Sequence, residues 1–164
     1  MVGKQLRAMI VGIPNVGKSS LVNRLSKSKK SRVEDRPGVT MNKQWITTDL
    51  GFDLLDMPGV LWPKFDDQND ALLLALLGSI NDDVLDKEGL VRFGLSYLKT
   101  IYPGKIAERY GVNEDGDHLL EAIAKEKLWL SSNGQIDIAK AVDLILKDIR
   151  SNKIGRITWQ DAGE

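Results

Sequence analysis

The first sixty residues contain short apolar runs of the length expected for strands. Residues 8–11 form the first run and predict a short buried strand, and the pattern of residues 20–25 that follows predicts a helix. Two further runs, residues 44–48 and 52–56, predict strands joined by a turn at residues 49–51. The N-terminal part is therefore expected to form a small sheet with at least one helix.

After residue 59 the pattern becomes helical. Composition and helical spacing of apolar positions predict five helices, at residues 70–77, 90–101, 106–110, 119–128 and 138–149. The last has an apolar stripe typical of a core rather than a partner groove, formed by Ile138, Val142, Ile145 and Ile149. Asp137 is expected to cap this helix, and Gly155 to follow its end. Residues 156–159 form the one later segment with a strand-like pattern.

These patterns predict an α/β protein in which a partial sheet of three strands is followed by an all-helical C-terminal domain. The boundary is expected near residues 80–88, in the polar segment that begins at Asn81. The predicted domains are therefore residues 1–85 and residues 86–164.

Composition adds limits on location and chemistry. The 164 residues are 42% hydrophobic and 28% charged and include no cysteine, so disulfides and thiolate metal sites are excluded. The longest uninterrupted apolar run, residues 71–77, is far too short to span a membrane. The N-terminus lacks the apolar core of a signal peptide, so no membrane partner and a cytoplasmic location are expected.

Charge is distributed unevenly although the formal net charge is zero. Residues 1–45 carry ten Lys and Arg against two acids, and residues 46–90 carry two against ten. Much of the first excess lies in residues 27–32 (Lys-Ser-Lys-Lys-Ser-Arg). Such a loop can contact RNA phosphates, and it can equally be a solvated surface loop.

The stretch of residues 12–19 fits the phosphate-binding loop motif G-x-x-x-x-G-K-[ST]. It lies between the predicted strand at residues 8–11 and the predicted helix that follows, which is the context that the motif requires. Backbone N–H groups in such a loop converge on phosphate oxygens at a helix N-terminus. Lys18 is expected to reach the β- and γ-phosphates, and the Ser19 hydroxyl to take one Mg²⁺ position. The predicted nucleotide-binding residues are Gly12, Asn15, Val16, Gly17, Lys18, Ser19, Ser20 and Gly59.

Two later elements follow at the order and distance found in GTPases. Thr40 lies in a turn-rich segment 22 residues after Lys18, and a D-x-x-G motif begins at Asp56, 16 residues further on. In a GTPase these parts surround Mg²⁺ and the γ-phosphate. Thr40 would then complete the metal shell, Asp56 would hold the metal through water, and the Gly59 N–H would contact the γ-phosphate. Lys18, Thr40 and Gly59 are accordingly the predicted catalytic residues.

Two parts of a typical GTPase are missing from the sequence. No N-K-x-D motif follows the D-x-x-G motif to read guanine. Residues 42–45 come too early, before the D-x-x-G motif, and have Trp where the aspartate belongs, and residues 152–155 have Gly there. The glutamine that orients water in Ras-like enzymes is replaced by Val60 and Leu61, which cannot hold a water molecule. Because the guanine-reading motif is missing, this chain by itself is expected to distinguish GTP from ATP poorly.

The motifs together resemble those of the circularly permuted ribosome-biogenesis GTPases of the YlqF/RbgA type. The resemblance covers nearly the whole chain, through the phosphate loop, the segment ending at Thr40, the D-x-x-G motif and residues 61–65. It continues through Phe93-Gly94-Leu95, Tyr102-Pro103, residues 108–111 and residues 148–150. In that family the guanine-reading motifs precede the phosphate loop and a helical domain resembling an RNA-binding module follows. The chain is similar to the portion that begins just before the phosphate loop.

The resemblance implies a GTPase, with GTP as substrate and Mg²⁺ as cofactor, that assists late assembly of the large ribosomal subunit and its rRNA. It also implies K⁺ binding through Asn15, because similar enzymes hold this ion with the asparagine of the loop. Two alternatives remain open from the residues: a non-hydrolysing RNA- or ribosome-binding fragment with an incomplete nucleotide site, and a P-loop ATPase. In either case the first strand is expected at an open sheet edge through which the chain could associate.

Overall fold

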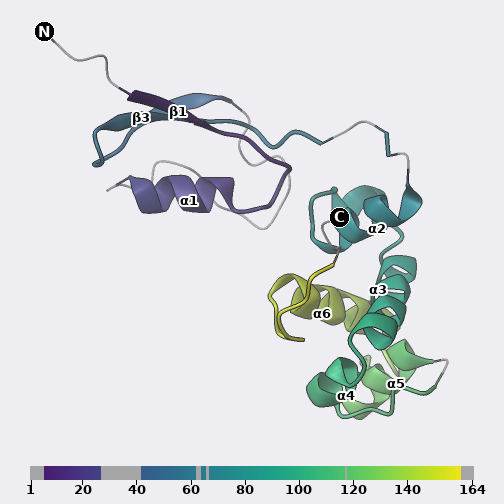
Figure 1. Ribbon diagram of the computed structural model, residues 1–164. Helices are drawn as coiled ribbons and strands as arrows, with labels where there is room; N and C mark the ends of the chain where they lie inside the picture. Colours follow the sequence, from purple (N-terminus) through teal and green to yellow (C-terminus); the bar gives the residue numbers. More distant parts are fainter. Residues whose placement is uncertain (1–5, 27–41, 62–63, 66, 117, 160–164) are drawn as a thin grey trace, which may run out of the picture. The chain divides into compact units, whose positions relative to one another are not determined.

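The computed structural model describes residues 6–26, 42–61, 64–65, 67–116 and 118–159. Within them, three strands form one sheet in the order β1-β3-β2, with β1 at Leu6–Ile10, β2 at Gln44–Thr47 and β3 at Phe52–Asp56. Strand β1 runs parallel to β3, and β2 is antiparallel to β3 (Figure 1). The α/β class and the three predicted strands are confirmed, with β1 beginning two residues earlier than expected.

Helix α1 (Lys18–Leu25) packs on one face of this sheet (Figure 1). Alternation along the strands directs Ile46 and Leu54 to the same face, where they enclose Val22 of the helix, and all three side chains are buried. Ile10, Leu25 and Phe52 pack partly buried against this cluster. The cluster sets the position of the helix that follows the phosphate loop.

The remaining described helices are α2 (Gln68–Leu76), α3 (Lys87–Ile101), α4 (Lys105–Tyr110), α5 (Leu119–Glu126) and α6 (Ile138–Arg150), with a short 3₁₀ helix at Asp82–Val84. Three of them begin at an aspartate whose side chain accepts a hydrogen bond from a backbone N–H of the first turn: Asp67, Asp86 and, as predicted, Asp137. None of the helices in the described ranges has both the length and the apolar character needed to cross a bilayer.

Helices α2, α3 and α6 pack together because Gly94 leaves room between them. A Cβ at Gly94 would lie 2.9 Å from Cδ2 of Leu76 on α2 and 3.5 Å from Cδ1 of Ile149 on α6. Most of the predicted stripe of α6 is in the core: Val142, Ile145 and Ile149 are buried, whereas Ile138 at the start of the helix is half-buried.

Several predictions for the helical part differ from the structure. Helix α5 ends at Glu126, and Leu128 beyond it has a left-handed φ of 53°. After α6 ends at Arg150, Asn152 with a φ of 57° comes before Gly155, whose φ is 136°, so Gly155 does not directly follow the helix end. Residues 156–159 form no strand, because Trp159 is instead stacked on Tyr97 of α3 with ring centroids 5.4 Å apart.

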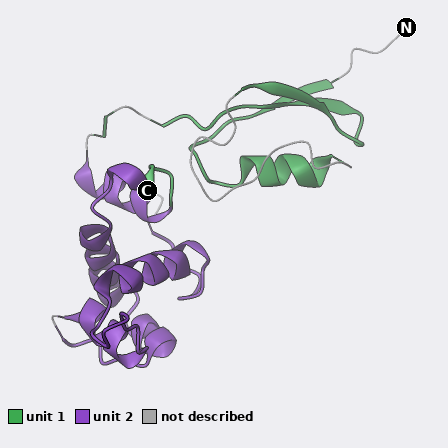
Figure 2. Cartoon of the chain, turned by 180° about the vertical axis from the view of Figure 1, so that it is seen from behind, with its two compact units in different colours: residues 1–66, 78–81 green, residues 67–77, 82–164 purple. Residues whose placement is uncertain are grey.

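The chain divides into two compact units, coloured separately in Figure 2. Unit 1 contains residues 1–66 and 78–81, and unit 2 contains residues 67–77 and 82–164. The predicted boundary at residue 85 placed α2 with the nucleotide-binding part. In the structure α2 packs against α3 and α6, so it belongs to the helical unit.

Candidate functional site

The predicted phosphate loop is an irregular turn between β1 and α1. Helix α1 begins at Lys18, and the residue before it, Gly17, has the left-handed angles φ 89° and ψ 15°. Because that conformation strains residues with a side chain, the second glycine of the motif is required by its dihedral angles. No side chain among the described residues caps this helix N-terminus. The N–H groups of its first turn point toward the N-terminal end, as in any helix, and so toward the loop where phosphates are expected.

The Lys18 side chain folds back over the loop. Its ammonium Nζ donates hydrogen bonds to the carbonyl oxygens of Gly12, at 3.1 Å, and Ile13, at 2.7 Å. Partial burial lowers the pKa of this ammonium, and the charge of Asp56 opposes that shift. The cation is therefore held at the loop and interacts electrostatically with the predicted metal-binding acid.

Asp56 ends strand β3 and is fully buried, with 0% of its surface exposed. It is the register partner of Ile10 at the end of β1, and because the two strands are parallel, both lead into the site at the same sheet edge. A buried carboxylate is costly unless a charged or polar group compensates it, and here Lys18 supplies such a charge.

The D-x-x-G loop lies directly against the phosphate loop. The Val60 N–H donates to Gly12 O at 3.2 Å, and a Cβ added to Gly59 would lie 2.6 Å from both Cα and N of Pro14. Gly59 is therefore required by a close approach of two backbones. The two loops therefore meet at Gly59, the predicted γ-phosphate contact, and at Gly12 of the predicted phosphate loop.

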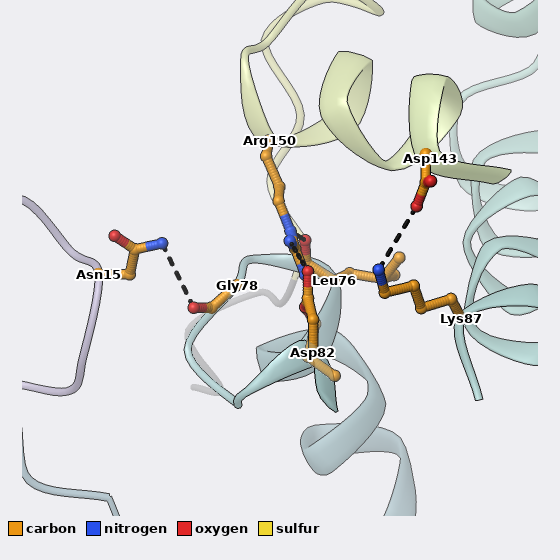
Figure 3. Close-up of polar contacts among 8 residues, drawn as sticks. Asn15, Leu76, Gly78, Asp82, Lys87, Asp143 and Arg150 are labelled. Carbon is orange, nitrogen blue, oxygen red and sulfur yellow. Dashed lines mark hydrogen bonds and ion pairs between the residues drawn. The ribbon is translucent and has the colours of Figure 1, made fainter. Parts of the chain in front are cut away.

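Asn15 lies at the tip of the loop with a left-handed φ of 63°. Its Nδ2 donates to the carbonyl of Gly78 at 3.3 Å, as Figure 3 shows. Ser79 Oγ donates to the carbonyl of Pro14 at 2.9 Å. Both partners lie more than sixty residues away along the chain, and no motif in the sequence indicates them.

The structure thus brings together most of the predicted site, which is formed by Gly12, Asn15, Val16, Gly17, Lys18, Ser19, Ser20, Asp56 and Gly59. Thr40 and the basic segment at residues 27–32 lie outside the described residues.

A magnesium ion is compatible with Ser19 and Asp56, two of the metal ligands predicted from the sequence. The Ser19 hydroxyl and the Asp56 carboxylate are hard oxygen donors, and Mg²⁺ is commonly bound by one or two protein oxygens with water and substrate phosphates completing its shell. Within the described ranges no group of three or more His, Cys, Asp or Glu side chains could form a metal cage by itself. One hydroxyl and one carboxylate oxygen fit a Mg²⁺ ion whose other ligands are water and phosphate.

Comparison with known proteins gives one matching family model, described as 50S ribosome-binding GTPase, over residues 7–88. Over 164 aligned residues, which include 98% of this chain, it is 43% identical to ribosome biogenesis GTPase A of Priestia megaterium and 42% identical to that of Bacillus cereus. The chain spans 57% and 55% of the length of these two relatives.

Two solved structures share the fold. The GDP-bound structure of TM YlqF matches with a TM-score of 0.65 at 24% identity, over 98% of this chain and 62% of the other. The GNP-bound YlqF of T. maritima matches with a TM-score of 0.63 at 25% identity, over 94% of this chain and 58% of the other. The predicted resemblance to YlqF-type proteins is confirmed.

Proposed function

Since this chain belongs to the family of 50S ribosome-binding GTPases, we propose that it binds GTP at the loop of residues 12–20. We further propose that the protein hydrolyses GTP to GDP and phosphate while it assists late assembly of the large ribosomal subunit. One observation carries the proposal: Lys18, the buried Asp56 and the close approach of Gly59 to Pro14 converge on one loop at a helix N-terminus. A GTPase needs these parts at the β- and γ-phosphates.

Phosphate binding would exploit groups that the folded loop already presents. The N–H groups at the start of α1 and the Lys18 ammonium are positive, and the nucleotide phosphates are negative. On binding, Lys18 would exchange its hydrogen bonds with the loop carbonyls of Gly12 and Ile13 for bonds with phosphate oxygens. Because the ammonium is already held at the loop, this exchange needs little ordering of the side chain.

The proposed metal is Mg²⁺, held by Ser19 and Asp56 and by Thr40 of the segment outside the described residues. When bound, the ion neutralises charge on the phosphate oxygens. The buried Asp56 carboxylate would be compensated from two sides, by the metal and by Lys18. The Gly59 N–H, placed beside the phosphate loop, would contact the γ-phosphate.

Water activation must differ from that of Ras-like enzymes. The residue after the D-x-x-G motif is Val60, whose side chain is 68% exposed and has no group that could hydrogen-bond the attacking water. We propose that K⁺ bound with the help of Asn15 supplies positive charge in this site. The Asn15 Nδ2 is directed to Gly78 O, which leaves Oδ1 as the amide atom that could ligate a cation.

The proposed partners are GTP and GDP, the large ribosomal subunit and its rRNA, with the helical unit and the basic segment of residues 27–32 as RNA-contacting parts. A cytoplasmic location follows from this partner and remains a prediction. A second candidate is a non-hydrolysing ribosome-binding fragment, which is favoured by the lack of an N-K-x-D motif in this sequence.

The test is nucleotide binding by Lys18→Ala, measured by calorimetry with GDP and with GTP in the presence of Mg²⁺. Loss of a charged hydrogen-bond donor to phosphate should weaken nucleotide binding by about tenfold to a hundredfold. Lys147→Ala, which removes an exposed lysine of α6, is the matched control and should bind like the parent. Equal affinity of the Lys18 variant and the parent would refute the phosphate site.

Phosphate release from GTP by the parent chain separates the two candidates. Binding with slow release of phosphate favours the GTPase, whereas binding with no release above the uncatalysed rate, with or without large ribosomal subunits, favours the non-hydrolysing fragment.

A further inference from the structure

A turn at residues 78–81, directly after α2, supports the tip of the phosphate loop from a distant part of the sequence. Ser79 is 2% exposed, and its Oγ donates to Pro14 O at 2.9 Å. The neighbouring carbonyl of Gly78 accepts the 3.3 Å hydrogen bond from Asn15 Nδ2 (Figure 3). The turn and the loop tip belong to the same compact unit.

The hydrogen bond from Ser79 acts directly on one rigid peptide unit, and the bond from the Asn15 side chain holds the residue that follows it. The carbonyl of Pro14 and the N–H of Asn15 lie in a single planar peptide unit, in which they point in opposite directions. A hydrogen bond that fixes the direction of Pro14 O therefore also fixes the direction of the Asn15 N–H. In a phosphate loop the directions of the N–H groups determine whether they converge on an anion.

The Asn15 backbone needs such support. Its φ of 63° is uncommon for a residue other than glycine, although asparagine tolerates this region better than most residues. The amide bond to Gly78 O and the hydroxyl bond to Pro14 O hold residues 14 and 15 together.

The loop tip is also supported from the side of the D-x-x-G loop. There Val60 N–H bonds Gly12 O, and Gly59 lies against the Pro14 backbone. The D-x-x-G loop is proposed to touch the nucleotide itself, whereas the Ser79 hydroxyl donates to the carbonyl of Pro14 in the predicted phosphate loop. Any effect of Ser79 on nucleotide binding must therefore pass through Pro14 and Asn15.

We propose that Ser79 is a positioning residue for nucleotide binding, which orients the Pro14–Asn15 peptide so that the Asn15 N–H is directed at the phosphates of a nucleoside diphosphate or triphosphate. This inference rests on the proposed nucleotide site and extends it to a residue outside every nucleotide-binding motif.

The test compares Ser79→Ala with the parent chain by calorimetry, using GDP and Mg²⁺. Loss of one buried hydrogen bond to the loop should weaken GDP binding about fivefold, which corresponds to about 1 kcal/mol. Ser151→Ala is the matched control, because the Ser151 hydroxyl also donates to a backbone carbonyl, that of Lys147, at 2.7 Å on the exposed end of α6. It should bind GDP like the parent.

Hydrogen exchange in the GDP-bound chain provides a readout that general destabilisation would not reproduce. In Ser79→Ala, exchange should accelerate at residues 12–17, while residues 90–98 of α3 exchange as in the parent. Ser79→Cys keeps a weaker donor of similar size, so its GDP affinity and its exchange rates at residues 12–17 should lie between those of the parent and the alanine variant. The same variant replaces Ser79→Ala in the test if the alanine variant does not fold.

The outcomes separate this inference from the proposed function. If Lys18→Ala loses GDP binding but both Ser79 variants bind and exchange like the parent, Ser79 has no positioning role. Exchange that accelerates equally at residues 12–17 and at residues 90–98 would also reject the positioning role of Ser79. If the parent itself does not bind GDP, the proposed nucleotide site fails, and this inference fails with it.

Discussion

At Gly59 glycine is required because two loops come close together. The two Pro14 atoms that an added Cβ would meet at 2.6 Å belong to the backbone, so no side-chain rotation could relieve the contact. We expect Gly59→Ala to lower the free energy of unfolding by about 1–3 kcal/mol, the usual cost of overpacking. Because the Gly59 N–H is the proposed γ-phosphate contact, calorimetry should show a larger loss of affinity for a non-hydrolysable GTP analogue than for GDP.

Gly116→Ala is the control for this substitution, since a Cβ there would meet nothing within 4 Å. It should change neither affinity nor stability by a measurable amount. Equal losses for GDP and the GTP analogue in Gly59→Ala would contradict the γ-phosphate contact, and parent-like stability would contradict the close approach.

The backbone conformation of residues 12–19 could be predicted because it is encoded locally. Gly17 needs a left-handed φ, and Lys18 follows it at the start of a helix, so a motif of eight residues carries the information. The hydrogen bonds from Asn15 and Ser79 join residues 63 and 65 positions apart. Such pairs depend on how the chain folds back, and a single sequence without related sequences contains no local signal for them.

At the scale of elements, Arg150 joins the end of α6 to the end of α2 and to the segment after it. Its guanidinium donates to the carbonyls of Leu76, at 3.1 Å, and Ala75, at 2.9 Å, and forms a bidentate ion pair with Asp82 at 2.7 and 2.8 Å (Figure 3). The two carbonyls belong to the last turn of α2, where helix carbonyls lack partners within the helix.

We expect Arg150→Met to lower the free energy of unfolding by about 1–3 kcal/mol, because it leaves these carbonyls and Asp82 without their cation. The side chains of Arg150 and Asp82 are 21% and 33% exposed, so solvent will moderate the loss. Urea unfolding followed by circular dichroism measures this loss of unfolding free energy.

The exposed Lys147→Met on the same helix is the control and should stay within about 0.5 kcal/mol of the parent. If the two variants have the same stability, the Arg150 contacts contribute nothing measurable.

Elements were predictable where their ends depend on neighbouring residues. Asp137 caps α6 through a 2.9 Å hydrogen bond from the Lys140 N–H, three residues away. Residues 156–159 have a strand-like local pattern, but no strand in the described part of the chain pairs with them, and the Trp159 side chain stacks on Tyr97. Likewise, the assignment of α2 to the helical unit depends on packing against α3 and α6, which the boundary prediction did not include.

At the scale of the whole chain, the sheet is open on the side of β1. Strand β1 pairs with β3, and within the described residues no strand pairs with its other edge. The side chains of this strand also remain accessible: Leu6 is 75% exposed, and Met9, on the face opposite α1, is 57% exposed. The predicted open edge is therefore confirmed for the described part of the chain, and an edge with apolar side chains is a site for association between chains.

We expect the chain to self-associate at micromolar concentrations through β1, and Met9→Lys to shift it toward the monomer. A charged residue on an edge strand opposes strand pairing, because the paired chains would have to bring these charges together and away from water. Sedimentation velocity at several concentrations measures the shift. Val84→Lys is the control, since Val84 is 76% exposed in the 3₁₀ helix of the other unit and receives the same change of chemistry. A parent chain that stays monomeric at high concentration, or a Met9 variant that associates as the parent does, would show that another element protects or replaces this edge.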